Sequence, residues 1–128
     1  GASKDRMKFR LPETYLLRAE AYLRQDMPDK AADAVNEVRR RAKVSDVSDE
    51  EMTMDFLLDE RIRELYGEES RRFTLIRTGK LLERVRKYNP EARDLIQDFH
   101  VLWPIPQAIR DANVGNFPQN PGYEGYEG

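Results

Sequence analysis

One stretch of the sequence, residues 59–80 (DERIRELYGEESRRFTLIRTGK), limits what the chain can fold into more than any other. On a helix, residues three and four apart share a face, so Glu60 can meet both Arg63 and Glu64. Two carboxylates at this spacing need an arginine between them or from another helix. The stretch therefore predicts helices held together by ion pairs, and not an active site. The predicted ion-pair lattice comprises Glu60, Arg61, Arg63, Glu64, Glu68, Arg71, Arg72 and Arg77.

The sequence before this stretch is typical of two antiparallel helices. Pro12 suits the first turn of a helix that runs to about Arg24, and Pro28 suits the first turn of a second helix. Apolar residues recur at helical spacing in both segments, and alanines occupy the positions expected to face the partner. Because small facing residues let two helices approach closely, we expect a helical hairpin similar to a tetratricopeptide repeat.

Two further helices are expected in the middle of the chain. Ser48 and Glu51 form a capping-box pattern, which predicts that a third helix follows them. A fourth helix is expected after Gly67, and Gly79 within it predicts either a close contact with a neighbour or an early break. The residues expected to face inward are Met54, Leu58, Ile62 and Leu65 in the third helix, and Phe73, Ile76, Leu82 and Val85 in the fourth.

The C-terminal part of the sequence has a different character. Asn89 followed by Pro90 predicts the start of a short helix that ends near Gln97. Residues 99–106 are expected to be extended, because a residue that precedes proline avoids the helical conformation. A further short helix is expected over residues 107–112.

The predicted fold class is all-α: a tetratricopeptide-like helical hairpin, further packed helices and an extended proline-rich C-terminal segment. At 128 residues the chain suits one compact domain. It begins at Gly1 without an initiating methionine or an apolar leader, so we expect part of a longer protein with a residual tag at its start. The expected divisions are a polar lead-in over 1–10, a helical domain over 11–112 and an irregular tail over 113–128.

The composition excludes several classes of function. A net charge of −2 argues against nucleic-acid binding, and the absence of cysteine excludes disulfides, thiolate metal sites and cysteine nucleophiles. No apolar run reaches the roughly eighteen residues that a membrane-spanning helix needs. With 39% hydrophobic and 36% charged residues, the sequence is typical of a soluble helical protein, and no cofactor is expected.

The residues that carry chemistry favour structural roles over catalysis. The arginines beside the glutamates favour ionised carboxylates, whereas a general acid must keep its proton. His100 is the single histidine, so neither a metal site nor a catalytic triad is predicted. Trp103 and Tyr123 are tentative sugar-stacking residues, because an aromatic ring offers a flat apolar face to a pyranose. The competing interpretation, which the sequence favours, places Trp103 in the core.

Three motifs resemble the C-terminal signature of the SusD/RagB family. Residues 103–106 (WPIP) resemble one family element, and residues 119–123 (QNPGY) match the closing motif. Thr74 stands where the family usually has aspartate. The residues of the ion-pair stretch that match the family pattern are Glu60, Arg61, Glu64, Leu65, Glu68, Arg71 or Arg72, Leu75, Arg77, Gly79 and Lys80. The resemblance covers most of the chain, from Leu11 to Tyr123.

The resemblance implies a function for the longer protein and a role for this part of it. SusD-like proteins are outer-membrane lipoproteins on the bacterial cell surface. They bind glycans without cleaving them and act with a SusC-type TonB-dependent transporter. Their helical scaffold tends to face the transporter, while glycan contacts come largely from loops elsewhere. We therefore expect this chain to be C-terminal scaffold that binds no nucleic acid, and no family glycan-contact residue is carried over to it.

Two other functions are weighed against this expectation. A free-standing tetratricopeptide-like adaptor, which binds a peptide in a helical groove, would explain the hairpin but not the QNPGY motif. A glycosidase would need a carboxylic acid that keeps its proton in a cleft, and the arginine-rich surroundings of the glutamates argue against one.

Overall fold

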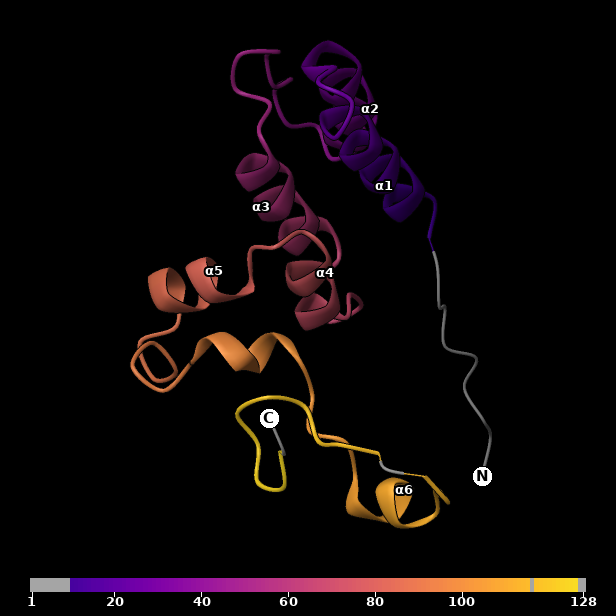
Figure 1. Cartoon of the computed structure of the whole chain (residues 1–128). Helices are drawn as coiled ribbons and strands as arrows, with labels where there is room; N and C mark the ends of the chain where they lie inside the picture. The colour runs from indigo at the N-terminus through magenta and orange to yellow at the C-terminus, as the bar shows by residue number, and fades with distance from the viewer. Residues whose placement is uncertain (1–9, 116, 127–128) are drawn as a thin grey trace, which may run out of the picture. The chain divides into compact units, whose positions relative to one another are not determined.

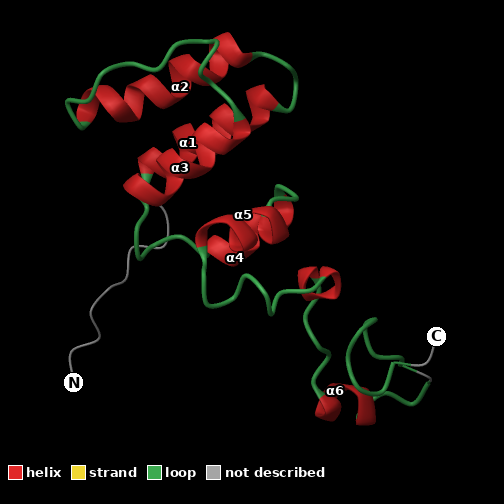
Figure 2. Ribbon diagram, turned by 90° about the vertical axis from the view of Figure 1, so that its left-hand side faces the viewer, coloured by secondary structure: helices red, strands yellow, loops and turns green. Residues whose placement is uncertain are grey.

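The computed structural model describes residues 10–115 and 117–126, and this part of the chain is all-helical, without a β-strand (Figures 1 and 2). The all-α prediction is therefore confirmed. The elements in chain order are α1 (Leu11–Leu23), α2 (Pro28–Arg41), α3 (Met54–Glu64), α4 (Arg71–Arg77), α5 (Leu81–Tyr88), the 3₁₀ helix η1 (Asp98–Val101) and α6 (Gln107–Asp111). The chain divides between Glu69 and Ser70 into two compact units. No helix in the described ranges is both long and apolar enough to span a bilayer.

Helices α1 and α2 pack side by side as the predicted hairpin in the first unit (Figure 1). Each has a proline in its first turn, where the missing N–H breaks no helical hydrogen bond. Ala19 of α1 and Ala31 of α2 are fully buried, together with Leu16 and Val35. Small residues thus bring the helices together, while larger apolar residues fill the rest of the core. The likeness to a tetratricopeptide repeat remains a prediction.

Helix α3 begins later than its capping signal predicts. Ser48 and Glu51 do form the reciprocal capping-box hydrogen bonds, but they close a turn that precedes the helix. Thr53 is the true N-cap, and its Oγ1 accepts a hydrogen bond from the backbone N–H of Phe56. The buried side chain of Met52 lies between the two, so the chain enters the core before the helix starts.

The inward face of α3 is also turned slightly from the predicted one. Leu58 and Leu65 are buried as expected, and Leu57 is buried as well. Ile62, expected inside, is 42% exposed. The buried face of α3 therefore includes Leu57 and excludes Ile62.

The predicted fourth helix is two helices, because the chain breaks at Gly79. This glycine has φ +71°, and the N–H groups of Gly79 and Lys80 bond to the carbonyls of Ile76 and Leu75. This pattern is a Schellman motif, which ends α4 and lets α5 start in a new direction. Of the two outcomes that the sequence allowed, the early break is the one observed.

The break changes which side chains of α4 and α5 are buried. Leu75 and Leu81, one on each side of Gly79, are buried, whereas Phe73, expected inside, is 63% exposed. A continuous helix would have carried one apolar stripe through residues 73–85, and two separate helices do not.

The segment after α5 is less regular than expected. The Asn89 side chain accepts hydrogen bonds from the N–H groups of Glu91 and Ala92, as an N-cap does, but the residues that follow form turns and no helix. Residues 98–101 form the 3₁₀ helix η1 and are not extended. Gln97 and His100 form a capping box around it, which stabilises the short helix over the predicted strand-like path. Helix α6 lies where a helix was expected, and the described part of the tail is irregular, as predicted.

Candidate functional site

The ion pairs of the first unit centre on Arg61, which is 2% exposed. Its Nε donates to the Glu69 carboxylate at 2.5 Å, and its Nη2 lies 3.7 Å from Glu13 of α1. The Nη1 atom is buried without an acceptor among the described residues. A buried guanidinium that loses its carboxylate is costly, so this contact ties α1 to α3 and to the turn that follows α3.

The carboxylates of α3 pair with arginines from earlier in the chain. Glu60 Oε2 accepts from Arg39 of α2 at 2.7 Å and from Arg63 at 3.0 Å. Arginines of α2 thus meet the carboxylates of the neighbouring helix, which is one of the two arrangements that the sequence required. The charge pattern of residues 59–80 alone could not identify the partner, although three consecutive arginines end α2.

Glu64 and Glu68 share a further arginine outside the stretch. Glu64 Oε1 accepts from Arg10 at 3.1 Å and from Arg41 at 3.2 Å, and Glu68 accepts from Arg10 at 2.6 Å. The hydrogen bond to Glu68, with a smaller contribution from Glu64, raises the pKa of Arg10. Among the other predicted members of the lattice, Arg71 and Arg77 lie on α4 in the second unit, and Arg72 has a separate environment described below.

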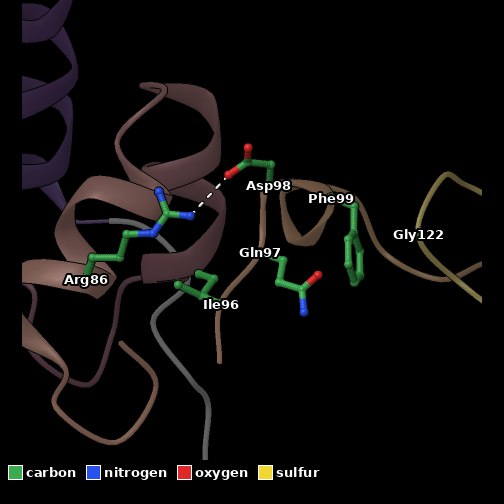
Figure 3. Close-up of a pocket in the computed structure, with 6 residues that line it drawn as sticks. All are labelled: Arg86, Ile96, Gln97, Asp98, Phe99 and Gly122. Carbon is green, nitrogen blue, oxygen red and sulfur yellow. Dashed lines mark hydrogen bonds and ion pairs between the residues drawn. The ribbon is translucent and has the colours of Figure 1, made fainter. Parts of the chain in front are cut away.

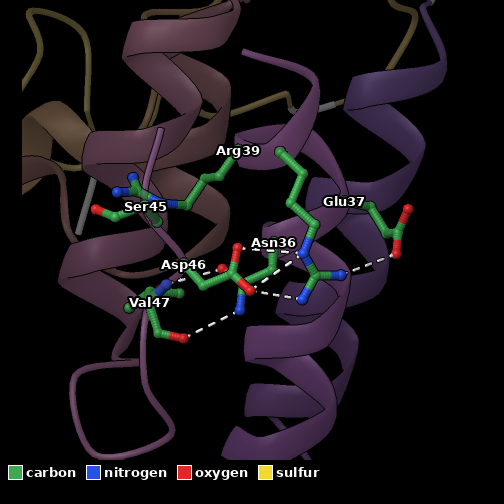
Figure 4. Close-up of polar contacts among 7 residues, drawn as sticks. Asn36, Glu37, Arg39, Ser45, Asp46 and Val47 are labelled. Atoms are coloured by element: carbon green, nitrogen blue, oxygen red, sulfur yellow. Dashed lines mark hydrogen bonds and ion pairs between the residues drawn. The ribbon is translucent and has the colours of Figure 1, made fainter. Parts of the chain in front are cut away.

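A buried amide fixes the loop between α2 and α3 (Figure 4). The Asn36 side chain donates to the Val47 carbonyl at 3.0 Å and accepts from the Val47 N–H at 2.8 Å. It therefore pairs with the loop backbone as a strand residue would. In the same part of the chain, Arg39 donates to the Ser45 carbonyl, and Arg40 forms an ion pair with Asp46. These polar groups bind the loop of their own chain.

The QNPGY motif forms a clamp on the WPIP segment in the second unit. Gln119 Oε1 accepts from the Ile105 N–H at 2.7 Å, and Gln119 Nε2 donates to the Ile105 carbonyl at 2.9 Å. Asn120 donates to the Trp103 carbonyl at 2.7 Å, and the Tyr123 hydroxyl donates to the Leu102 carbonyl at 2.9 Å. Residues 119–123, which we call the C-terminal clamp, thus hold the main chain of residues 102–105.

A glycine lets the clamp approach an aromatic ring. Gly122 has φ +86°, and a Cβ there would lie 2.2 Å from the Phe99 ring. Tyr123 meets the same ring edge-on, with the ring centroids 5.0 Å apart. Only glycine fits this contact, both because of its left-handed backbone and because of the space it leaves. The Tyr123 ring is half-buried and its hydroxyl is bonded to the main chain.

The indole of Trp103 is held differently. It is 54% exposed, so its interpretation as a core residue is wrong for the chain described here. The Arg72 guanidinium carbon lies 4.5 Å from the centre of the ring, in a cation–π arrangement. Arg72 in turn donates from Nη2 to the His100 carbonyl. The clamp and Arg72 therefore fix Trp103 while leaving much of the indole open to solvent.

Residues 96–100 help to line two hollows. A cavity of about 520 Å³ is lined by Arg86, Ile96, Gln97, Asp98, Phe99 and Gly122. Figure 3 shows Arg86 and Asp98 reaching each other across it, with an ion pair of 3.1 Å. A second cavity of about 330 Å³ is lined by Arg72, Val85, Asn89, Ala92, Leu95, Ile96 and His100. Both combine apolar walls with a few charged and amide groups, and both are wide open to solvent.

The described residues hold no cluster of three or more histidine, cysteine, aspartate or glutamate side chains that could bind a metal ion. His100 Nδ1 accepts a hydrogen bond from the Gln97 N–H, and the imidazole lies against the Phe99 ring. The single histidine therefore takes part in the capping box and in ring packing. The chemistry that the second unit offers is contact through an aromatic face and hydrogen bonds.

Comparison with protein families gives one clear result. The family model described as SusD family matches residues 1–123 of the chain. No solved structure gives a significant match.

Curated relatives agree with the family match. The chain is 36% identical over 115 residues to the SusD-like protein P25 of Formosa agariphila and 35% identical over 125 residues to the starch-binding protein SusD of Bacteroides thetaiotaomicron. These alignments include 81% and 91% of the chain, but 21% of each relative. A further Formosa agariphila protein, SusD-like protein P38, is 32% identical over 108 residues, which are 76% of the chain and 20% of that protein. The chain thus spans about a fifth of the length of the relatives it matches.

Proposed function

The chain belongs to the SusD family, and from this premise we propose that it is the C-terminal helical part of a glycan-binding protein of the bacterial outer membrane. In this proposal the longer protein is a surface lipoprotein that captures oligosaccharide or polysaccharide and passes it to a SusC-type TonB-dependent transporter. The helical first unit serves as scaffold and faces the transporter. The protein binds its glycan without cleaving it.

The observation that supports the scaffold role is what the residues of the family pattern contact. Arg61 binds carboxylates of its own unit, and Glu60 and Glu64 bind arginines of α2. Gln119 binds both polar groups of the Ile105 main chain. Side chains that are buried or engaged in internal contacts hold a fold together and are not presented to a ligand.

The same pairing supports a non-catalytic role. Glycoside cleavage needs a carboxylic acid that keeps its proton near a second carboxylate. Here Glu60, Glu64 and Glu68 each pair with an arginine nitrogen within 3.2 Å, so the chain itself uses all three carboxylates. A free-standing adaptor is less well supported, because it gives no reason for a clamp built from the closing family motif.

A chimera tests the proposal. The part of the Bacteroides thetaiotaomicron starch-binding protein that aligns with this chain, about a fifth of its length, is replaced with this chain. The chimera is run by affinity electrophoresis in gels with and without starch, and it is purified from cells that carry the SusC-type transporter. We expect starch to retard it as it retards the parent, and the transporter to co-purify.

Two results would contradict the proposal. If a chimera with a normal melting curve lost the transporter, the scaffold assignment would be wrong. If it bound the transporter but starch no longer retarded it, the replaced part of the relative would carry glycan contacts that this chain does not reproduce. The division into scaffold and binding region would then fail.

A further inference from the structure

We infer that Trp103 is a preorganised stacking surface for a gluco-configured pyranose, held by Arg72 and the C-terminal clamp. The inference rests on the proposed function, because it takes the longer protein to bind a glycan. It adds one sugar contact from the part of that protein otherwise assigned to the scaffold. Four features of the second unit support it: a fixed main chain, a fixed ring, an open indole and a hollow beside Arg72.

The main chain around Trp103 is fixed at three points. Tyr123 binds the Leu102 carbonyl, Asn120 binds the Trp103 carbonyl, and Gln119 binds Ile105. Pro104 and Pro106 restrict the same segment further, because each has a fixed φ angle. A side chain on such a segment loses little freedom when a ligand binds, and this raises affinity.

The ring itself is oriented by Arg72. The guanidinium stacks on the indole and is anchored to the His100 carbonyl, so the ring is supported without being covered. Tyr123 lacks the same geometry, because its ring meets Phe99 and its hydroxyl is bonded to Leu102. We therefore assign the stacking role to Trp103 alone, and Tyr123 positions the segment.

The surroundings match a sugar better than an apolar partner. Trp103 is not among the residues that line the cavity of about 330 Å³, but the Arg72 guanidinium that stacks on its ring is, and Asn89 and His100 add polar groups to the apolar walls there. A gluco-configured pyranose has equatorial hydroxyls around its edge and axial C–H groups on its faces. Its faces therefore suit the indole, and its edges suit amide and guanidinium donors.

The test uses the fact that Trp103 is the only tryptophan in the chain. Its emission is followed during titration with maltoheptaose in one arm and cellohexaose in the other, which separates α-linked from β-linked glucose. We expect a saturable blue shift and protection from acrylamide quenching in at least one arm, with a Kd on the order of 1 mM, because one stacked sugar is a small contact.

Two variants separate the stack from general charge. Arg72→Lys keeps the charge but loses the planar stack, and we expect affinity to fall about threefold or more. Arg18→Lys is the matched control, because Arg18 lies over the Tyr22 ring in the first unit, 5.4 Å from its centre. It should leave the titration unchanged. Trp103→Ala, read by affinity electrophoresis, should abolish any retardation that the chain shows.

Three results would overturn the inference. One is an unchanged emission in both arms from a chain whose circular dichroism is helical. Another is an emission shift that depends on protein concentration without sugar, which would assign the Trp103 face to a second copy of the chain. The third is equal weakening by Arg72→Lys and Arg18→Lys. None of these would affect the starch and transporter results of the chimera, so the inference and the proposed function fail separately.

Discussion

At the scale of single residues, buried polar side chains of this chain bind main chain or one another. Asn36 and Gln119 each pair with both the N–H and the carbonyl of one residue, Val47 and Ile105 respectively. Each lies in an otherwise irregular region, where the backbone has no helix or sheet to satisfy it. The two amides therefore take the place of secondary structure in holding these segments.

Asn36→Ala is expected to destabilise the chain by about 2 kcal/mol, because it leaves the buried N–H and carbonyl of Val47 without partners. Urea denaturation followed by circular dichroism measures this change. Asn113→Ala is the control, since Asn113 bonds the Ile109 carbonyl in an exposed position. Equal effects of the two substitutions would show that Asn36 does not hold the loop.

Glu69→Gln is expected to cost about 3 kcal/mol, because Arg61 would keep a buried charge without its nearest carboxylate. Glu37→Gln, at an exposed ion pair with Arg40, should change the free energy of unfolding by less than about 1 kcal/mol. The double variant Arg61→Met/Glu69→Leu should recover most of the loss, since it also removes the buried Nη1 donor that lacks an acceptor. A double variant as unstable as Glu69→Gln would contradict the ion-pair account.

At the scale of elements, glycines decide where helices of the second unit end and how closely segments meet. Gly79 ends α4 in the left-handed conformation, with open space around its missing side chain. Gly122 has a similar backbone but lies against the Phe99 ring. A side chain at Gly79 would therefore meet backbone strain alone, whereas one at Gly122 would meet backbone strain and a clash with the Phe99 ring.

Gly79→Ala should destabilise the chain by about 1 kcal/mol, the cost of a left-handed residue with a Cβ. Gly122→Ala should cost several times more, because the new methyl group would overlap the Phe99 ring and displace the clamp. Thermal melts of both variants test the difference, and Trp103 emission reports on the clamp. Similar losses in the two variants would mean that the Phe99 contact is easily relieved.

How far the sequence predicted the elements follows from the range of each signal. The proline starts of α1 and α2 and the left-handed glycine after α4 act locally, so their positions could be predicted. Whether Gly79 would break the helix depended on how Leu75 and Leu81 are buried, which no local pattern gives. The predicted start of α3 was wrong because Ser48 and Thr53 both fit the pattern of a helix N-cap, and the sequence does not show which of them begins the helix.

For the candidate site, the sequence identified residue types better than their surroundings. Trp103 was singled out from its chemistry, but its exposure depends on Arg72, thirty-one residues earlier, and on the clamp. Arg10 and Arg39 were missed as partners of the glutamates, because neither the single Arg10 nor the run of arginines that ends α2 shows which helix it will face. Contacts between segments that are distant in the sequence depend on tertiary packing, which no local sequence pattern predicts.

At the scale of the whole molecule, the chain is a helical member of the SusD family in which family-pattern residues serve the fold. The ion pairs of the first unit join α2 to α3, and the clamp of the second unit fixes residues 102–105. On this account the motifs are shared because they build a scaffold, and the glycan is met by residues that the scaffold presents. Trp103 is a half-exposed aromatic residue that the clamp and Arg72 hold in place.

The most direct test of this account is the unfolding of Gln119→Ala, followed by guanidinium titration with Trp103 emission as the probe. We predict a loss of about 2–3 kcal/mol and a red-shifted native emission, because the Ile105 main chain would lose both of its hydrogen bonds to Gln119. Gln25→Ala serves as the control, because the Gln25 side chain donates to the Ala21 carbonyl in an exposed position. The contradicting result is an unchanged unfolding curve for Gln119→Ala, together with a loss of starch binding when the same substitution is made in the chimera. It would show that the closing motif contacts ligand and does not hold the fold.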